Sequence, residues 1–86
     1  MKKKSDVLVS VLMGSDSDLS VMKEALETLK KFGIPYELYL TSAHRTPDRT
    51  KAFAQKAEGR GVKVLIVGAG AAAHLAGVVA SLSRLP

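Results

Sequence analysis

The sequence contains no cysteine and no tryptophan, and aromatic residues make up only 5% of its 86 positions. Without cysteine, the chain can form neither a disulfide framework nor a thiolate metal site, and it lacks a cysteine nucleophile. Two tyrosines and two phenylalanines are too few to build a platform on which nucleic-acid bases stack. The chemistry of the chain therefore rests on its other polar and charged side chains.

Long hydrophobic runs are missing as well. No apolar stretch approaches the roughly 20 residues that a membrane-spanning helix requires. Residues 1–13 superficially resemble a secretory signal, because three lysines precede an apolar run. Asp6 interrupts that pattern, and Ser-Asp-Ser-Asp follows in place of a small-residue cleavage site. We therefore expect a cytoplasmic protein that has no membrane partner.

The formal net charge of +5 arises largely from the N-terminal end. Lys2, Lys3 and Lys4 belong to residues 1–5, which we interpret as a solvated basic tail. Without these lysines the net charge falls from +5 to +2. Because so small a charge provides no basic face for phosphate backbones, we expect no nucleic-acid partner.

Segments of strand and helix character alternate along the remaining residues. Residues 6–13 and 62–67 are apolar runs rich in Val and Leu, typical of strands buried on both faces of a parallel sheet. Residues 36–41 alternate more between polar and apolar side chains, which favours a position nearer an edge. Helical patterns cover residues 19–32, 47–59 and 71–82. The order βαβαβα predicts an α/β fold with a parallel sheet and right-handed crossovers.

Helix boundaries follow from glycine, proline and hydroxyl residues. Gly33 suits the position after the end of the first helix, and Pro35 prevents that helix from continuing. Thr46 is predicted to cap the second helix, with Pro47 in its first turn.

Residues 62–67 form the most continuously apolar strand, and we expect this strand to be central, with a neighbour on each side. A bare apolar edge on a parallel sheet promotes aggregation. A second copy could cover that edge, but we favour the interpretation that a longer protein continues the sheet. Residues 1–86 are then a single incomplete domain, in which residues 6–86 form the βαβαβα half.

Residues 14–18, Gly-Ser-Asp-Ser-Asp, lie between the first strand and the first helix, where free backbone N–H groups favour an anion. The hydroxyl groups of Ser15 and Ser17 can donate to a phosphate. Asp16 and Asp18 repel phosphate, so that one of them is better suited to neutral hydroxyl groups such as a ribose diol. The alternative is a plain helix-capping cluster, and spacing alone does not choose between the two.

Residues 42–47, Ser-Ala-His-Arg-Thr-Pro, follow the second strand. Ligands of open α/β sheets bind at the carboxyl ends of strands, so a histidine and an arginine there are well placed for chemistry. His44 is a candidate proton carrier and Arg45 a fixed cation. The alternative for His44 is a polar loop residue. We expect no metal site, because the two histidines of the chain lack helix-spaced carboxylate partners.

Residues 68–73, Gly-Ala-Gly-Ala-Ala-Ala, follow the third strand and fit the G-x-G-x-x-G/A pattern of dinucleotide-binding loops. That pattern normally follows the first strand of such folds, so a dinucleotide-binding half-domain is an alternative rather than the first expectation. Gly70 lets the backbone approach a ligand closely. His74, at the start of the third helix, is by itself more typical of a surface or capping residue.

Three motifs, MGSDSD at 13–18, SAHRTPDR at 42–49 and GAGAAAHLAG at 68–77, together resemble the N5-carboxyaminoimidazole ribonucleotide mutase family of purine biosynthesis. This family is also called the catalytic subunit of phosphoribosylaminoimidazole carboxylase. The resemblance spans essentially the whole chain and implies a flavodoxin-like three-layer sandwich, a homo-octamer, and no cofactor or metal. It also implies a mutase reaction, which moves a carboxylate from the exocyclic nitrogen of a ribonucleotide substrate to C4 of its imidazole ring.

Matching positions in these motifs imply roles for individual residues. Ser15 and Arg45 resemble contacts of the substrate phosphate, and Asp18 resembles the ribose ligand. His44 resembles the general acid and base, with Ser42 beside it. The loop that encloses the migrating carboxylate corresponds to Ala69, Gly70, His74 and Leu75.

The motifs depart from the family pattern at two positions, where Ala71 replaces a glycine and Ala76 a proline. A methyl group at position 71 could narrow the pocket, and the helix start is less rigid without proline at position 76. The resemblance leaves two alternatives open: a sister class that takes free CO2, and a nucleotide-phosphate-binding fragment that lacks activity.

Overall fold

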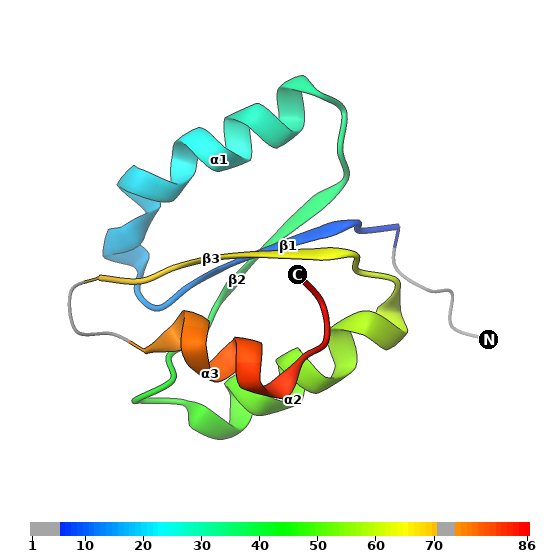
Figure 1. Ribbon diagram of the computed structural model, residues 1–86. Helices are drawn as coiled ribbons and strands as arrows, with labels where there is room; N and C mark the ends of the chain where they lie inside the picture. The colour runs from blue at the N-terminus through cyan, green and yellow to red at the C-terminus, as the bar shows by residue number, and fades with distance from the viewer. Residues whose placement is uncertain (1–5, 71–73) are drawn as a thin grey trace.

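The computed structural model describes residues 6–70 and 74–86, which form alternating strands and helices (Figure 1). The strands are β1 (Val9–Met13), β2 (Tyr36–Leu40) and β3 (Val64–Gly68). The helices are α1 (Leu19–Lys31), α2 (Pro47–Ala57) and α3 (Leu75–Leu82). Short 3₁₀ turns at Asp16–Asp18 and Glu58–Arg60 precede α1 and follow α2. The predicted βαβαβα order is confirmed, while the basic tail at 1–5 and the predicted helix start at Ala71 lie outside the described residues.

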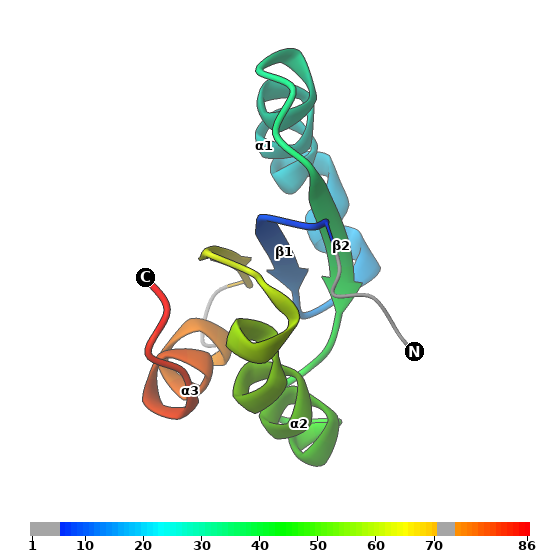
Figure 2. The same cartoon turned by 90° about the vertical axis from the view of Figure 1, so that its right-hand side faces the viewer.

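The strands run parallel in the order β2-β1-β3, with α1 on one face of the sheet and α2 and α3 on the other (Figure 1 and Figure 2). This order equals the first three positions of the flavodoxin-like order 2-1-3-4-5. The three-layer α/β fold predicted from the sequence is therefore confirmed. No helix within the described ranges is long and apolar enough to cross a membrane.

β1 is buried on both faces, as its apolar composition predicts, because each face packs against a different helix layer. Val9, Val11 and Met13 join Met22 and Leu29 of α1 in one core cluster. The second cluster, on the face toward α2 and α3, comprises Leu12, Phe53, Ala54, Ala57, Val62, Leu75 and Val79. The central strand therefore connects the two cores, and its carboxyl end is held firmly between them.

β3 lies at one edge of the described sheet. Although β3 is the most continuously apolar strand, the central strand of the described sheet is β1, which pairs with both neighbours. β3 has one strand partner there, so Val64 is 38% exposed and the rest of the strand is only half-buried. The neighbouring strand that its apolar run favours on the other side stays a prediction. On its other side, the Leu65 N–H donates to the Pro86 carbonyl at 2.8 Å.

The structure confirms both predicted helix boundaries. Gly33 follows α1 with a φ of 69°, as predicted for the residue after a helix end. Thr46 stands before α2 with Pro47 in the first turn, but the Thr46 hydroxyl does not cap the helix. It accepts from the Ser42 N–H at 3.0 Å and donates to the Ser42 carbonyl at 3.1 Å. The predicted N-cap position is therefore confirmed, although the hydroxyl closes the preceding turn instead of bonding to the first turn of the helix.

Candidate functional site

The loops after β1 and β2 and the described part of the loop after β3, residues 69–70, lie together at the carboxyl ends of the strands, where the sequence predicts the site. Among the described residues, two cavities open there and share Gly14, Ser15 and Ser42 as a common wall. We name them the arginine cavity and the histidine cavity after the side chains that distinguish them.

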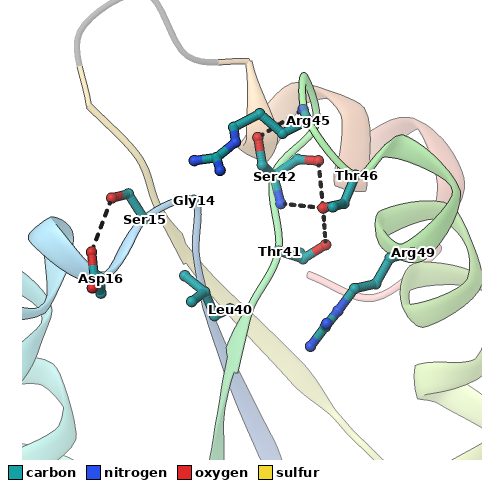
Figure 3. A pocket seen from close by; sticks show the side chains of 9 residues that line it. All are labelled: Gly14, Ser15, Asp16, Leu40, Thr41, Ser42, Arg45, Thr46 and Arg49. Atoms are coloured by element: carbon teal, nitrogen blue, oxygen red, sulfur yellow. Dashed lines mark hydrogen bonds between the residues drawn. The ribbon is translucent and has the colours of Figure 1, made fainter.

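The arginine cavity has a volume of about 320 Å³ and lies between the β1 loop, the end of β2 and the start of α2 (Figure 3). Arg45 extends toward Ser15, whereas Arg49 leaves the start of α2 and points away from both of them. The lining comprises Gly14, Ser15, Asp16, Leu40, Thr41, Ser42, Arg45, Thr46 and Arg49. The lining contains two guanidinium groups and one carboxylate, and this excess of positive charge suits an anion.

The histidine cavity has a volume of about 200 Å³ and draws on all three loops. Its lining comprises Gly14, Ser15, Ser17, Asp18, Ser42, Ala43, His44, Ala69, Gly70 and Leu75. His44 is exposed and Asp18 is half-buried. A carboxylate that can accept from hydroxyl groups and an imidazole that can carry a proton therefore border the same space.

A capping box organises the β1 loop. The Ser17 N–H donates to Ser15 Oγ at 3.3 Å, and the Ser15 N–H donates to Asp18 Oδ2 at 3.1 Å. The expectation of a helix-capping cluster is therefore correct for the local structure. Ser15 and Asp18 also line the cavities, so the bonds that cap the turn fix the orientation of both side chains there.

The β2 loop is organised around Ser42. Ser42 Oγ accepts from the backbone N–H groups of His44 at 3.3 Å and of Arg45 at 3.1 Å. Below the loop, the buried hydroxyls of Thr41 and Thr50 bond at 2.8 Å, which ties the end of β2 to α2. These bonds fix the backbone from which the candidate proton carrier and the candidate phosphate contact project.

The structure brings His74 against His44. Their ring centroids lie 5.4 Å apart with the ring planes at 62°, in an edge-to-face contact. His74 stands before α3, exposed and without a side-chain capping bond, so a second imidazole lies beside the candidate proton carrier. Within residues 6–70 and 74–86, no three His, Asp or Glu side chains gather where they could hold a metal ion.

The β3 loop contributes Ala69 and Gly70 to the histidine cavity, and the buried Leu75 lines it from α3. Gly68 has a packing role, because a Cβ at this position would lie 2.2 Å from Met22 Sδ. The absence of a side chain lets α1 approach β3 closely. Packing therefore accounts for the first glycine of the dinucleotide-like pattern without any ligand.

The outer edge of β2 carries a separate network of charged and aromatic side chains. Glu37 accepts from both terminal nitrogens of Arg60 and from the buried Ser10 hydroxyl. The bonds from Arg60 lower the pKa of the Glu37 carboxyl below its ordinary value of 4.5, although burial acts in the opposite direction. Arg60 lies over the Phe53 ring, which stacks on Tyr39 with ring centroids 4.2 Å apart. The network holds the Tyr39 ring in place.

Sequence reasoning missed Arg49 as a residue of the site. It assigned the phosphate to Ser15 and Arg45, and the structure adds Arg49 to the same cavity. The signal is present in the sequence, since a helix that begins at Pro47 keeps Arg49 in its first turn and beside the preceding loop.

Comparison with known proteins connects this geometry to one family. The AIR carboxylase family matches residues 8–86. A Pyrococcus horikoshii protein named N5-carboxyaminoimidazole ribonucleotide mutase is 58% identical over 84 residues, which are 98% of this chain and 48% of that protein. A Thermotoga maritima protein of the same name is 60% identical over 78 residues, covering 91% of this chain and 46% of that protein. The Saccharomyces cerevisiae protein named phosphoribosylaminoimidazole carboxylase is 56% identical over 79 residues, covering 92% of this chain and 14% of that protein. The chain thus spans about half the length of these two mutases.

Proposed function

The chain belongs to the AIR carboxylase family, and from this membership we propose that it acts in purine biosynthesis on an aminoimidazole ribonucleotide. The reaction converts N5-carboxyaminoimidazole ribonucleotide to 4-carboxy-5-aminoimidazole ribonucleotide by transferring a carboxylate within the substrate. The relatives named as mutases support this choice, because they are 58% and 60% identical to the chain, against 56% for the yeast protein named as a carboxylase.

The common wall of the two cavities is the observation that carries the proposal. A ribonucleotide has a phosphate at one end and a base at the other, and the two cavities meet at Gly14, Ser15 and Ser42. The phosphate binds to Ser15 and Arg45 in the arginine cavity. The ribose and the imidazole base bind in the histidine cavity, where Asp18 accepts from the ribose hydroxyls.

The chemistry takes place in the histidine cavity. The carboxylate leaves the exocyclic nitrogen as CO2, and C4 of the imidazole attacks that CO2. The N–C bond breaks and a C–C bond forms, while the nitrogen gains one proton and C4 loses one. His44 serves both transfers, because donating the first proton leaves it neutral and able to accept the second. Ser42 lies beside His44, and the migrating carboxylate is enclosed by Ala69, Gly70, His74 and Leu75.

The site needs a cover during the reaction. His44 and Arg45 are exposed, whereas released CO2 must be kept from the solvent. Neighbouring copies provide this cover in the homo-octamer that the family resemblance implies, and the assembly acts in the cytoplasm. Bonds and protons balance in this scheme without a cofactor or a metal.

A substrate labelled with ¹³C in its carboxylate tests the proposal. In unlabelled bicarbonate, the 4-carboxy product should retain most of the label. Product that takes its carboxyl carbon from bicarbonate would instead identify the class that uses free CO2. If the ribonucleotide binds and no product forms, the protein is a non-catalytic binding module. Saturable binding of NADH would favour the dinucleotide-binding alternative.

A further inference from the structure

The side chain of Thr46 makes a set of hydrogen bonds to which the proposed function gives no role. Its hydroxyl accepts from the Ser42 N–H at 3.0 Å and donates to the Ser42 carbonyl at 3.1 Å. The backbone N–H of Thr46 donates to the same carbonyl at 2.9 Å. One residue thus binds both peptide groups that flank the Ser42 side chain, and these bonds close the loop of residues 42–46.

Ser42 in turn holds the backbone of the candidate proton carrier. Its Oγ accepts from the backbone N–H groups of His44 at 3.3 Å and of Arg45 at 3.1 Å. Both bonds require a defined direction of the Ser42 side chain, which follows from the backbone that Thr46 fixes. The place of His44 therefore depends on a hydroxyl two residues further along the chain.

The Thr46 hydroxyl is tied to the buried base of the loop. It lies 3.3 Å from the hydroxyl of Thr41, which lies 2.8 Å from the hydroxyl of Thr50. Thr41 and Thr50 are only 2% and 0% exposed. Because the single proton of the Thr46 hydroxyl goes to the Ser42 carbonyl, the Thr41 hydroxyl is the donor in its contact with Thr46. A chain of hydroxyl groups thus connects the exposed loop with the buried contact between β2 and α2.

These bonds occupy the Thr46 hydroxyl completely. A hydroxyl has one proton and two lone pairs, and the bonds with Ser42 and Thr41 use all three. The hydroxyl also makes no capping bond to α2. We propose that Thr46 is a positioning residue, whose hydroxyl fixes the Ser42 loop and thereby sets the place of the His44 imidazole for proton transfer. This inference rests on the proposed function, because it assumes that His44 carries the proton.

The test replaces Thr46 with valine, which is close to threonine in shape but has no hydroxyl. Turnover of N5-carboxyaminoimidazole ribonucleotide should fall by about tenfold, because a displaced proton carrier works more slowly. Affinity for this ribonucleotide should change by less than about twofold, since the valine fills the same place in the lining of the arginine cavity. Thr46→Ser keeps the hydroxyl and should recover turnover to within about twofold of the wild type. If Thr46→Val does not fold, Thr46→Ala removes the same hydroxyl and takes its place in the comparison.

Solvent exchange of amide protons, measured by NMR, reports on the loop independently of catalysis. In Thr46→Val the amides of Ser42 and His44 should exchange about three- to tenfold faster, and in Thr46→Ser they should exchange as in the wild type. Thr28→Val is the matched control. Thr28 Oγ1 also donates to the carbonyl four residues earlier, that of Glu24 at 2.9 Å, but Thr28 lines neither cavity. This control should leave turnover and the exchange of both amides unchanged.

The outcomes separate this inference from the proposed function. If the wild type turns over and Thr46→Val matches it, Thr46 does not position His44, and the proposed function stands. Equal losses of turnover and affinity would show that Thr46 shapes the whole site, and a loss that Thr46→Ser does not recover would exclude the hydroxyl as its cause. Either result overturns the inference. If the wild type binds the ribonucleotide and forms no product, the proposed function fails, and the role of Thr46 fails with it.

Discussion

The arginine cavity and the histidine cavity share one wall but are built in different ways. The arginine cavity takes its lining from positions within residues 14–16 and 40–49, at the ends of two neighbouring strands and the first turn of α2. The histidine cavity also needs residues 69–70 and Leu75, which come from the β3 loop and α3. An anion site therefore forms from two strand-to-helix junctions, whereas the candidate site of proton transfer needs all three.

The largest expected effect is on turnover, and it comes from a substitution in the histidine cavity that leaves binding in the arginine cavity unchanged. His44→Asn keeps a polar side chain but removes the titratable imidazole, so turnover should fall by about 100-fold or more. Ribonucleotide affinity should change by less than about twofold, because the arginine cavity and Asp18 remain intact. Steady-state kinetics and a direct binding titration measure the two quantities. Turnover close to that of the wild type at saturating substrate would refute the role of His44.

Arg45→Gln should give the opposite pattern. It removes a charge-assisted contact with the phosphate, so affinity for the monophosphate should fall by about 10- to 100-fold. Affinity for the unphosphorylated nucleoside and turnover at saturating substrate should change far less. Calorimetric titration with both ligands measures the difference. Equal losses for the two ligands would show that Arg45 does not act through the phosphate.

Gly68→Ala should disturb the histidine cavity and spare the arginine cavity. The new Cβ would lie 2.2 Å from Met22 Sδ, so the Met22 side chain must change its conformation within the core or α1 must shift. The free energy of unfolding should decrease by about 1–3 kcal/mol, as measured by denaturant titration. In a Met22→Ala background the same substitution should cost little, because the obstructing atoms are gone. Equal costs in both backgrounds would remove the contact as the explanation.

The smallest expected effect concerns Glu37 on β2, which lines neither cavity. The pKa of Glu37 is lowered by its bonds with Arg60, so the pair stabilises the fold above pH 4.5. This stabilisation is lost as the pH falls through the lower pKa of the folded state. Because the pair is partly exposed, the loss should stay below about 1 kcal/mol. Glu37→Gln should flatten this part of the curve of stability against pH, and an unchanged curve would contradict the assignment.

Much of the fold could be predicted because each element carries its own local signal. Gly33 and Pro47 mark helix ends, and the apolar run of β1 reports burial on both faces. The apolar run of β3 predicts a strand on each side, and the described residues supply a strand on one side only, so the second neighbour stays a prediction. The bonding of Thr46 was missed because its hydroxyl had two local partners, the helix start and the preceding turn.

The candidate site could be predicted only as a set of separate side chains. Ser15, Asp18 and His44 follow strands, and that position alone suggests a ligand-binding role. The common wall of Ser15 and Ser42 depends on how two strand-to-helix junctions are placed by the packing of α1 and α2 on β1. Arg49 has a local signal, because it follows Pro47 in the first turn of α2, but its place in the lining of the arginine cavity depends on the same packing.

Amide NMR of the ¹⁵N-labelled protein tests most directly whether the two cavities hold opposite ends of one ribonucleotide. The protein is titrated with an aminoimidazole ribonucleoside and, separately, with its 5′-monophosphate. The amide signals of His44 and Gly70 should move with both ligands, and those of Arg45 and Thr46, which line only the arginine cavity, should respond mainly to the monophosphate. A phosphate-independent response at Arg45, or no response at His44 to either ligand, would contradict the division of the site into a phosphate cavity and a reaction cavity.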